Sequence, residues 1–247
     1  MDKLGGYYQS YKSQYNNNND IDVDLRQQQH GSAPFRYLVN QGFTCGLAST
    51  VLESSQKAFA LRIWVVDNSG SMSARDGHRV VPEEKKELKR YDKSSTVSVG
   101  GGDEVGCRIE SCTRWEEICE TVRYHAHLAA IMETPTIFRL LNDPGSNVGQ
   151  QQFSIAEEGA EYIEEDLEIM ENIISCAKPE GVTPLSKHIK EIREGLFSIA
   201  SQLRSSGQKV CIVIATDGLP TDEEGYGGPD ITNEFIASLK SLEGLPI

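Results

Sequence analysis

The stretch FALRIWVVDNSGS, residues 59–71, decides the fold class. It opens with a nearly continuous apolar run, which is typical of a strand buried on both faces of a parallel sheet. Polar residues follow at once, so Asp67, Ser69 and Ser71 come where the strand ends. The stretch KVCIVIATDG, residues 209–218, repeats this arrangement, again with an aspartate after the apolar run. We therefore predict two buried strands whose ends carry oxygen-bearing side chains.

Amphipathic helical patterns separate the expected strands. Thr113 followed by Glu116 is a capping-box signature and predicts where the first helix begins. Further strands are expected at 136–141 and 152–155. Strands that alternate with such helices predict an α/β fold with a doubly wound, mostly parallel sheet and helices on both faces. Three apolar stripes have helical spacing: Trp115, Ile118, Val122, Ala126 and Ala129; Ile163, Leu167, Met170 and Ile174; and Leu185, Ile189, Ile192, Leu196, Ile199 and Leu203.

Five side chains are expected to meet at one edge of this sheet. The carboxyl ends of parallel strands share an edge, which brings Asp67 and Asp217 together. Thr183, in GVTPL, precedes the helix that leads into the second strand. With Ser69 and Ser71 these residues offer only oxygen, which suits Mg²⁺, Mn²⁺ or Ca²⁺ rather than zinc or copper. We predict that the five side chains hold one divalent cation.

The order Asp-x-Ser-x-Ser, a distant Thr and a distant Asp resembles the metal-ion-dependent adhesion site of von Willebrand factor type A domains, the fold of integrin I domains. The resemblance implies that Ser69, Ser71 and Thr183 coordinate the ion through their hydroxyls. It implies that Asp67 and Asp217 act directly or through water. A carboxylate from a protein partner then completes the coordination, so the metal bridges two proteins and does no chemistry.

The resemblance covers roughly residues 58–247, as a Rossmann-like sheet, and departs from the family at two places. Residues 72–112 form an apparent insertion, which we expect near the metal face, where it would shape the partner site. The chain ends in LEGLPI, where the family has further strands and a last helix. We expect either a fragment or completion by another chain, and an unpaired sheet edge favours self-association.

Simpler interpretations stay open for each loop. Asp67 to Ser71 reads as a turn, Thr183 before Pro184 as a helix cap, and Asp217 before Gly218 as a loop start. One alternative function is a scaffold domain of a larger intracellular complex with an idle metal site.

A less favoured alternative is a Mg²⁺-dependent enzyme resembling the haloacid-dehalogenase-like phosphatases. Those enzymes need a second aspartate two residues after the nucleophile, where this chain has Ser69. The sequence also has neither GxxxxGK[ST] nor GxSxG. We therefore predict that the chain is not an enzyme.

Composition narrows the partners and the compartment. The chain has 24 basic and 37 acidic residues and a net charge of -13, which argues against nucleic acid and anionic membranes as partners. No run is long enough to span a bilayer, and the N-terminus lacks the apolar core of a signal peptide, so we expect an intracellular, cytoplasmic protein. Residues 1–33, rich in Asn and Gln, are predicted to be a disordered tail that is a second candidate for self-association. Residues 34–57 lead into the domain.

Overall fold

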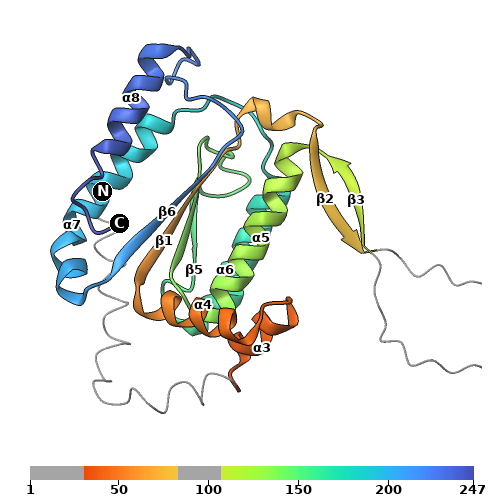
Figure 1. Cartoon of the computed structure of the whole chain (residues 1–247). Helices are drawn as coiled ribbons and strands as arrows, with labels where there is room; N and C mark the ends of the chain where they lie inside the picture. Colours follow the sequence, from red (N-terminus) through yellow and green to blue (C-terminus); the bar gives the residue numbers. More distant parts are fainter. Residues whose placement is uncertain (1–30, 83–106) are drawn as a thin grey trace, which may run out of the picture.

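The computed structural model describes residues 31–82 and 107–247. A four-stranded sheet with the order β5-β4-β1-β6 forms its centre (Figure 1). Strand β1 runs parallel to β4 and β6, whereas β5 runs antiparallel to β4. The α/β class is therefore confirmed, and the sheet is mixed because β5 is reversed. The strands are β1 (Phe59–Val66), β4 (Thr136–Leu140), β5 (Gln152–Ile155) and β6 (Lys209–Ala215).

Helices cover both faces of this sheet. On one face the stripes of α5 and α6 pack against Trp64, Phe138 and Ile155 of the strands. On the other face the stripe of α7 packs against Ile63 and Val65, with α8 beside it. All three predicted stripes thus face the core. The helices are α5 (Arg114–Met132), α6 (Ile163–Cys176), α7 (Leu185–Ser206) and α8 (Pro229–Lys240).

Strand β6 lies at a lateral edge of the sheet, so its apolar run packs on both faces, as predicted, but is less buried than a central strand would be. Only Val210 is well buried, and residues 211–215 stay partly exposed. Among the described strands, β6 has β1 as its one neighbour. At its start Val210 N donates to Pro246 O over 2.8 Å, so the last residues of the chain run beside it there. An apolar run indicates that a strand is covered on its faces, but it does not reveal whether the strand has a neighbouring strand on one side or on both.

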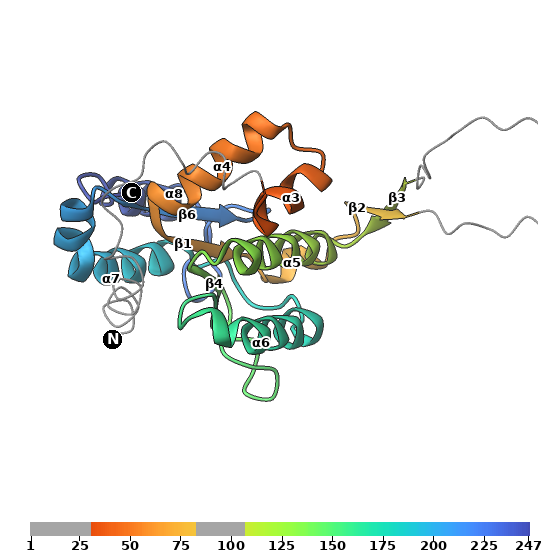
Figure 2. The same ribbon diagram turned by 90° about the horizontal axis from the view of Figure 1, so that it is seen from below.

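The chain forms a separate antiparallel ribbon after β1 and before α5. It consists of β2 (Gly77–Pro82) and β3 (Cys107–Cys112), after the short helix η1 (Gly70–Ser73). Figures 1 and 2 show the ribbon projecting from the body. The expected insertion at 72–112 is thus described only at its two ends, because 83–106 lie outside the described residues.

The helix after this ribbon begins as its capping box predicts. The Thr113 hydroxyl accepts from Glu116 N over 3.1 Å, and the Glu116 carboxylate accepts from Thr113 N over 2.7 Å. Because both partners are neighbours in the chain, the sequence alone is enough to locate this helix start.

The lead-in segment is helical and belongs to the body. Leu38 and Leu52 pack against Met132 at the end of α5. The predicted tail at 1–33 lies almost wholly outside the described residues, and Ser32 caps the first described helix through Phe35 N. None of the helices built from the described residues is both long and apolar enough to cross a membrane. The two lead-in helices are α3 (Ala33–Asn40) and α4 (Cys45–Lys57).

Candidate functional site

Neighbouring strands bring Asp67 and Asp217 to one edge of the sheet. Val66 at the end of β1 pairs with Ala215 at the end of β6, and Asp67 N donates to Ala215 O over 2.9 Å. Beyond these ends the chain continues toward α5 on one face and toward α8 on the other. In α/β sheets, connections that diverge from adjacent strands open a crevice at the carboxyl ends, where ligands bind.

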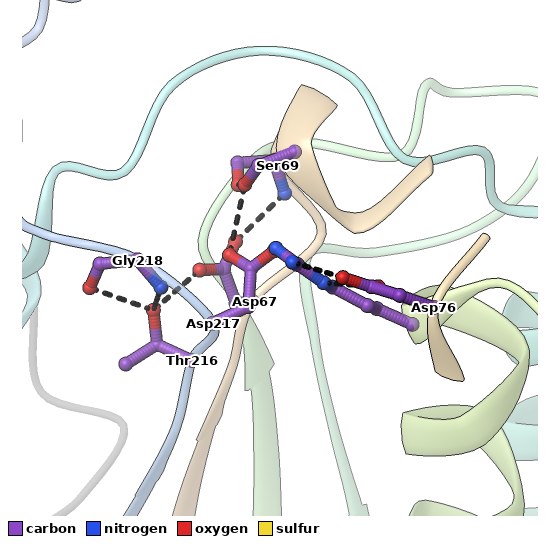
Figure 3. A network of polar contacts seen from close by, with 8 residues as sticks. Asp67, Ser69, Asp76, Thr216, Asp217 and Gly218 are labelled. Atoms are coloured by element: carbon purple, nitrogen blue, oxygen red, sulfur yellow. Dashed lines mark hydrogen bonds and ion pairs between the residues drawn. The ribbon is translucent and has the colours of Figure 1, made fainter. Parts of the chain in front are cut away.

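A continuous set of hydrogen bonds links four of the five predicted site residues. Asp67 is fully buried, and its Oδ1 accepts from Ser69 N over 2.8 Å. Ser69 Oγ lies 3.0 Å from Ser71 Oγ, and Ser71 Oγ donates to Asp217 Oδ1 over 2.8 Å. In Figure 3, Asp67 and Asp217 lie at the centre of the view, with Thr216 on one side and Asp76 on the other. The Asp67–Ser69 contact is that of a turn, as the simpler interpretation of this loop expects. The loop also contacts Asp217, just beyond the end of β6, through Ser71.

Thr183, the fifth residue, reaches the same edge on the loop before α7. This loop contacts the first one through Gly70 N, which donates to Gly181 O over 3.2 Å. The helix has Pro184 as its N-cap and no side-chain cap, so the interpretation of Thr183 as a capping residue is wrong. Thr183 is only 6 % exposed, yet within the described residues its hydroxyl makes no hydrogen bond. That hydroxyl is available to a ligand.

Two asparagines that the sequence did not single out hold these loops together. Asn68 Oδ1 accepts from Asn142 N over 2.8 Å, and Asn68 Nδ2 donates to Asn142 O over 3.0 Å. The Asn142 side chain in turn donates to Val182 O over 2.8 Å and accepts from Val182 N over 3.1 Å. Asn142 follows β4, so it fastens the loops after β1 and before α7 to a third strand end.

Two threonines beyond β6 were also missed. Thr216 Oγ1 donates to Asp67 Oδ2 over 2.6 Å, so both oxygens of this buried carboxylate are held in place. Thr221 braces the other loop, because its Oγ1 accepts from Thr183 N and its N–H donates to Thr183 O, each over 2.9 Å. These contacts orient the predicted ligand residues Asp67 and Thr183 without supplying further charge.

Arg114, the first residue of α5, places a positive charge at this edge. Its Nη1 lies 2.6 Å from Asp217 Oδ2, while Nε and Nη2 bond both oxygens of Asp76 over 2.6 and 2.5 Å. These bonds, first to Asp76 and then to Asp217, raise the pKa of Arg114. The bond to Arg114 is the main cause that lowers the pKa of Asp76. Arg114 thus joins Asp217 to the loop before β2.

The chemistry of the donor set fits a hard divalent cation. Two carboxylates and three hydroxyls give oxygen ligands without excess charge. Within residues 31–82 and 107–247, no three or more His, Cys, Asp or Glu side chains gather in a way that could hold a metal. A cation at this edge therefore needs the serine and threonine hydroxyls for much of its coordination.

Comparisons with family models, with curated proteins and with solved structures give no significant match to the chain. What the protein does is therefore inferred from its own residues.

Proposed function

We propose that the chain is a von Willebrand factor type A-like module that binds a protein partner through one divalent cation, Mg²⁺ or, in its place, Mn²⁺ or Ca²⁺. Asp67, Ser69, Ser71, Thr183 and Asp217 would hold the ion. The ion supplies positive charge that attracts an acidic side chain of the partner, and no bond is made or broken. The chain's own residues orient the ion and leave the partner's position open.

The observation that carries this proposal is the contact between Ser71 and Asp217. They are 146 residues apart in the chain, and their side chains are 2.8 Å apart. The resemblance requires the loop after the first strand to meet the loop after a distant strand, and this contact agrees with it. The parallel pairing of β1 with β4 and β6 is compatible with a doubly wound sheet.

The surroundings of Asp217 favour a protein over a small molecule as the ligand. Leu219 and Tyr226 lie in the loop that Asp217 begins, and they are 78 % and 72 % exposed. Exposed aliphatic and aromatic side chains on the loop that follows the site suit a protein interface, where aromatic residues are enriched. A phosphatase-like enzyme is less favoured, because Ser69 stands where its second aspartate is needed. The net charge of -13 argues against nucleic acid.

Capture of partners on the immobilised chain tests the proposal. Asp67→Asn keeps the size of the side chain and an acceptor for Ser69 N, but it removes the charge. We expect partners to be retained in Mg²⁺ and released by EDTA, and to be lost with Asp67→Asn. Glu164→Gln, the same charge change at an exposed position of α6, is the matched control. Capture that ignores both EDTA and Asp67→Asn would favour the scaffold function with an idle metal site.

A further inference from the structure

A second candidate site lies along the lateral edge of the sheet that β5 forms, away from the strand ends that carry the first site. A cavity of about 900 Å³ opens between β5, the loop before it and α6. None of the described residues that line this cavity is a lysine, arginine or histidine. The carboxylates that line it are Glu157, Glu158, Glu165, Asp166 and Glu168.

Glu157 contributes a buried carboxyl group to this cavity, with an oxygen atom that is unsatisfied in the described part of the chain. It is 6 % exposed, and its Oε1 has no hydrogen-bond partner among the described residues. Burial raises the pKa of Glu157 to about 7, aided by the charges of Glu158 and Asp166 and opposed by a hydrogen bond from Ser154. A buried polar atom without a partner costs free energy, which an incoming cation would relieve. The cavity therefore favours a positively charged ligand.

The carboxylates of the cavity do not converge on one point. Within the described parts of the chain, no group of three or more acidic, histidine or cysteine side chains is arranged to hold a metal ion. The negative charge is instead distributed between the loop after β5 and successive turns of α6. A ligand with several separated positive charges matches this distribution better than a single ion.

The cavity also borders a strand edge. Leu140 N on β4 donates to Gln151 O over 2.9 Å, and Phe138 is paired with Phe153. Because peptide groups alternate in direction along an antiparallel strand, those of Gln152 and Ser154 face away from β4. Both residues line the cavity, and β5 is the last strand on this side of the described sheet. The cavity is thus a groove between the open edge of β5, which offers backbone donors and acceptors, and the acidic side chains of α6.

We propose that this groove binds an extended, basic peptide segment of a partner protein. The segment adds as a strand to the outer edge of β5 and sets its lysine or arginine side chains against Glu157, Glu165 and Glu168. Main-chain hydrogen bonds give such strand addition its affinity, and pockets for alternate side chains give it specificity. The proposal does not depend on the metal site, which lies at the carboxyl ends of β1 and β6.

Fluorescence anisotropy with a labelled, end-blocked peptide of alternating valine and lysine tests the charge requirement, in EDTA. Glu165→Gln with Glu168→Gln removes two charges from the cavity. Glu161→Gln with Glu164→Gln removes two charges from exposed positions outside it. We expect the first double variant to weaken binding by about fivefold or more and the second by less than about twofold. Circular dichroism verifies that both variants fold.

A peptide with N-methyl groups on alternate residues tests the strand pairing, because it keeps the charges and loses backbone donors. We expect it to bind at least about tenfold more weakly than the parent peptide. Equal binding of the two peptides would overturn strand addition. Equal effects of the two double variants, equal binding of a valine–glutamate peptide, or no binding of the valine–lysine peptide to the folded chain would overturn the site itself.

Discussion

Arg114 Nη1 lies 2.6 Å from Asp217 Oδ2, so a cation of the chain itself contacts the aspartate at the end of β6. Ser71 holds the other oxygen of the same carboxylate. A divalent ion bound through Asp217 would compete with the guanidinium for this negative charge. Arg114 is therefore expected to set the metal affinity of the site and to link it to Asp76, before β2.

Arg114→Gln should strengthen Mg²⁺ binding by about tenfold, which is ~1.4 kcal/mol, because the competing charge is removed. Isothermal titration calorimetry measures the change. Arg123→Gln removes the same charge from α5 at a place where Arg123 pairs with Glu171 of α6, and it should leave the affinity unchanged. Unchanged or weaker binding in Arg114→Gln would contradict the competition, even if the metal site itself exists.

Thr183→Val should weaken Mg²⁺ binding by about tenfold while stability changes by less than about 1 kcal/mol. The hydroxyl makes no hydrogen bond in the described residues, so its loss should remove only the proposed metal ligand. Thr221→Val is the matched control, because it removes the acceptor of Thr183 N and should cost about 1–3 kcal/mol of stability. Calorimetry and urea denaturation separate the two effects. Undiminished metal affinity in Thr183→Val would remove this residue from the ligand set.

Gly181→Ala should destabilise the chain by about 3 kcal/mol. Gly181 has a φ of 90°, and a Cβ there would lie 2.4 Å from Asn142 Oδ1, which holds the loop through Val182 N. Gly207→Ala is the control, because Gly207 also has a positive φ, of 69°, but nothing lies within 4 Å of its Cβ position. It should cost only about 1 kcal/mol. Equal losses in urea denaturation would show that the contact with Asn142 does not matter.

The parts of the fold predicted correctly are those whose signals are local. The strand expected at 152–155 is β5, residue for residue, and the capping box at Thr113 marks the start of α5. The pattern around Asp67 and Asp217 also located the candidate site, because strand ends carry their side chains to a shared edge. These predictions needed only periodicity, a helix cap and the polar residues that follow each apolar run.

The parts that were missed depend on which segments meet in space. Asn142 and Thr216 have ordinary loop sequences, and their roles arise only from contacts with Val182 and Asp67. Arg114 follows a recognisable helix cap, but nothing near it in the sequence reveals that its partner lies after β6. For the same reason the apolar run of β6 did not disclose an edge position.

His188 should make stability depend on pH. Its Nδ1 accepts from Arg139 Nε over 2.8 Å, its Nε2 lies 2.9 Å from Leu141 O, and burial with the charge of Arg139 lowers its pKa to about 4. The unfolded chain takes up this proton near pH 6.5 and the folded chain near pH 4. The contribution of His188 to the free energy of unfolding is therefore fully present above pH 6.5. It is lost as the pH drops toward 4, and the loss is about 2 kcal/mol at pH 5.

Urea denaturation at pH 7.5 and pH 5 measures this dependence. His188→Gln should reduce the difference between the two pH values by about 2 kcal/mol. His127→Gln, at an exposed position of α5, should leave the difference unchanged. An unaltered pH dependence in His188→Gln would contradict the assignment to this residue.

Titration of the purified chain with Mg²⁺ by calorimetry, alongside Asp67→Asn, tests the metal site most directly. Asp67 is fully buried between Ser69 N and Thr216 Oγ1, so the asparagine keeps the packing while it removes the charge. We predict saturable binding of one ion per chain, weakened by more than about tenfold in a variant that stays folded. A folded wild-type chain that binds none of Mg²⁺, Mn²⁺ and Ca²⁺, or an Asp67→Asn variant that binds as tightly, would contradict the proposal.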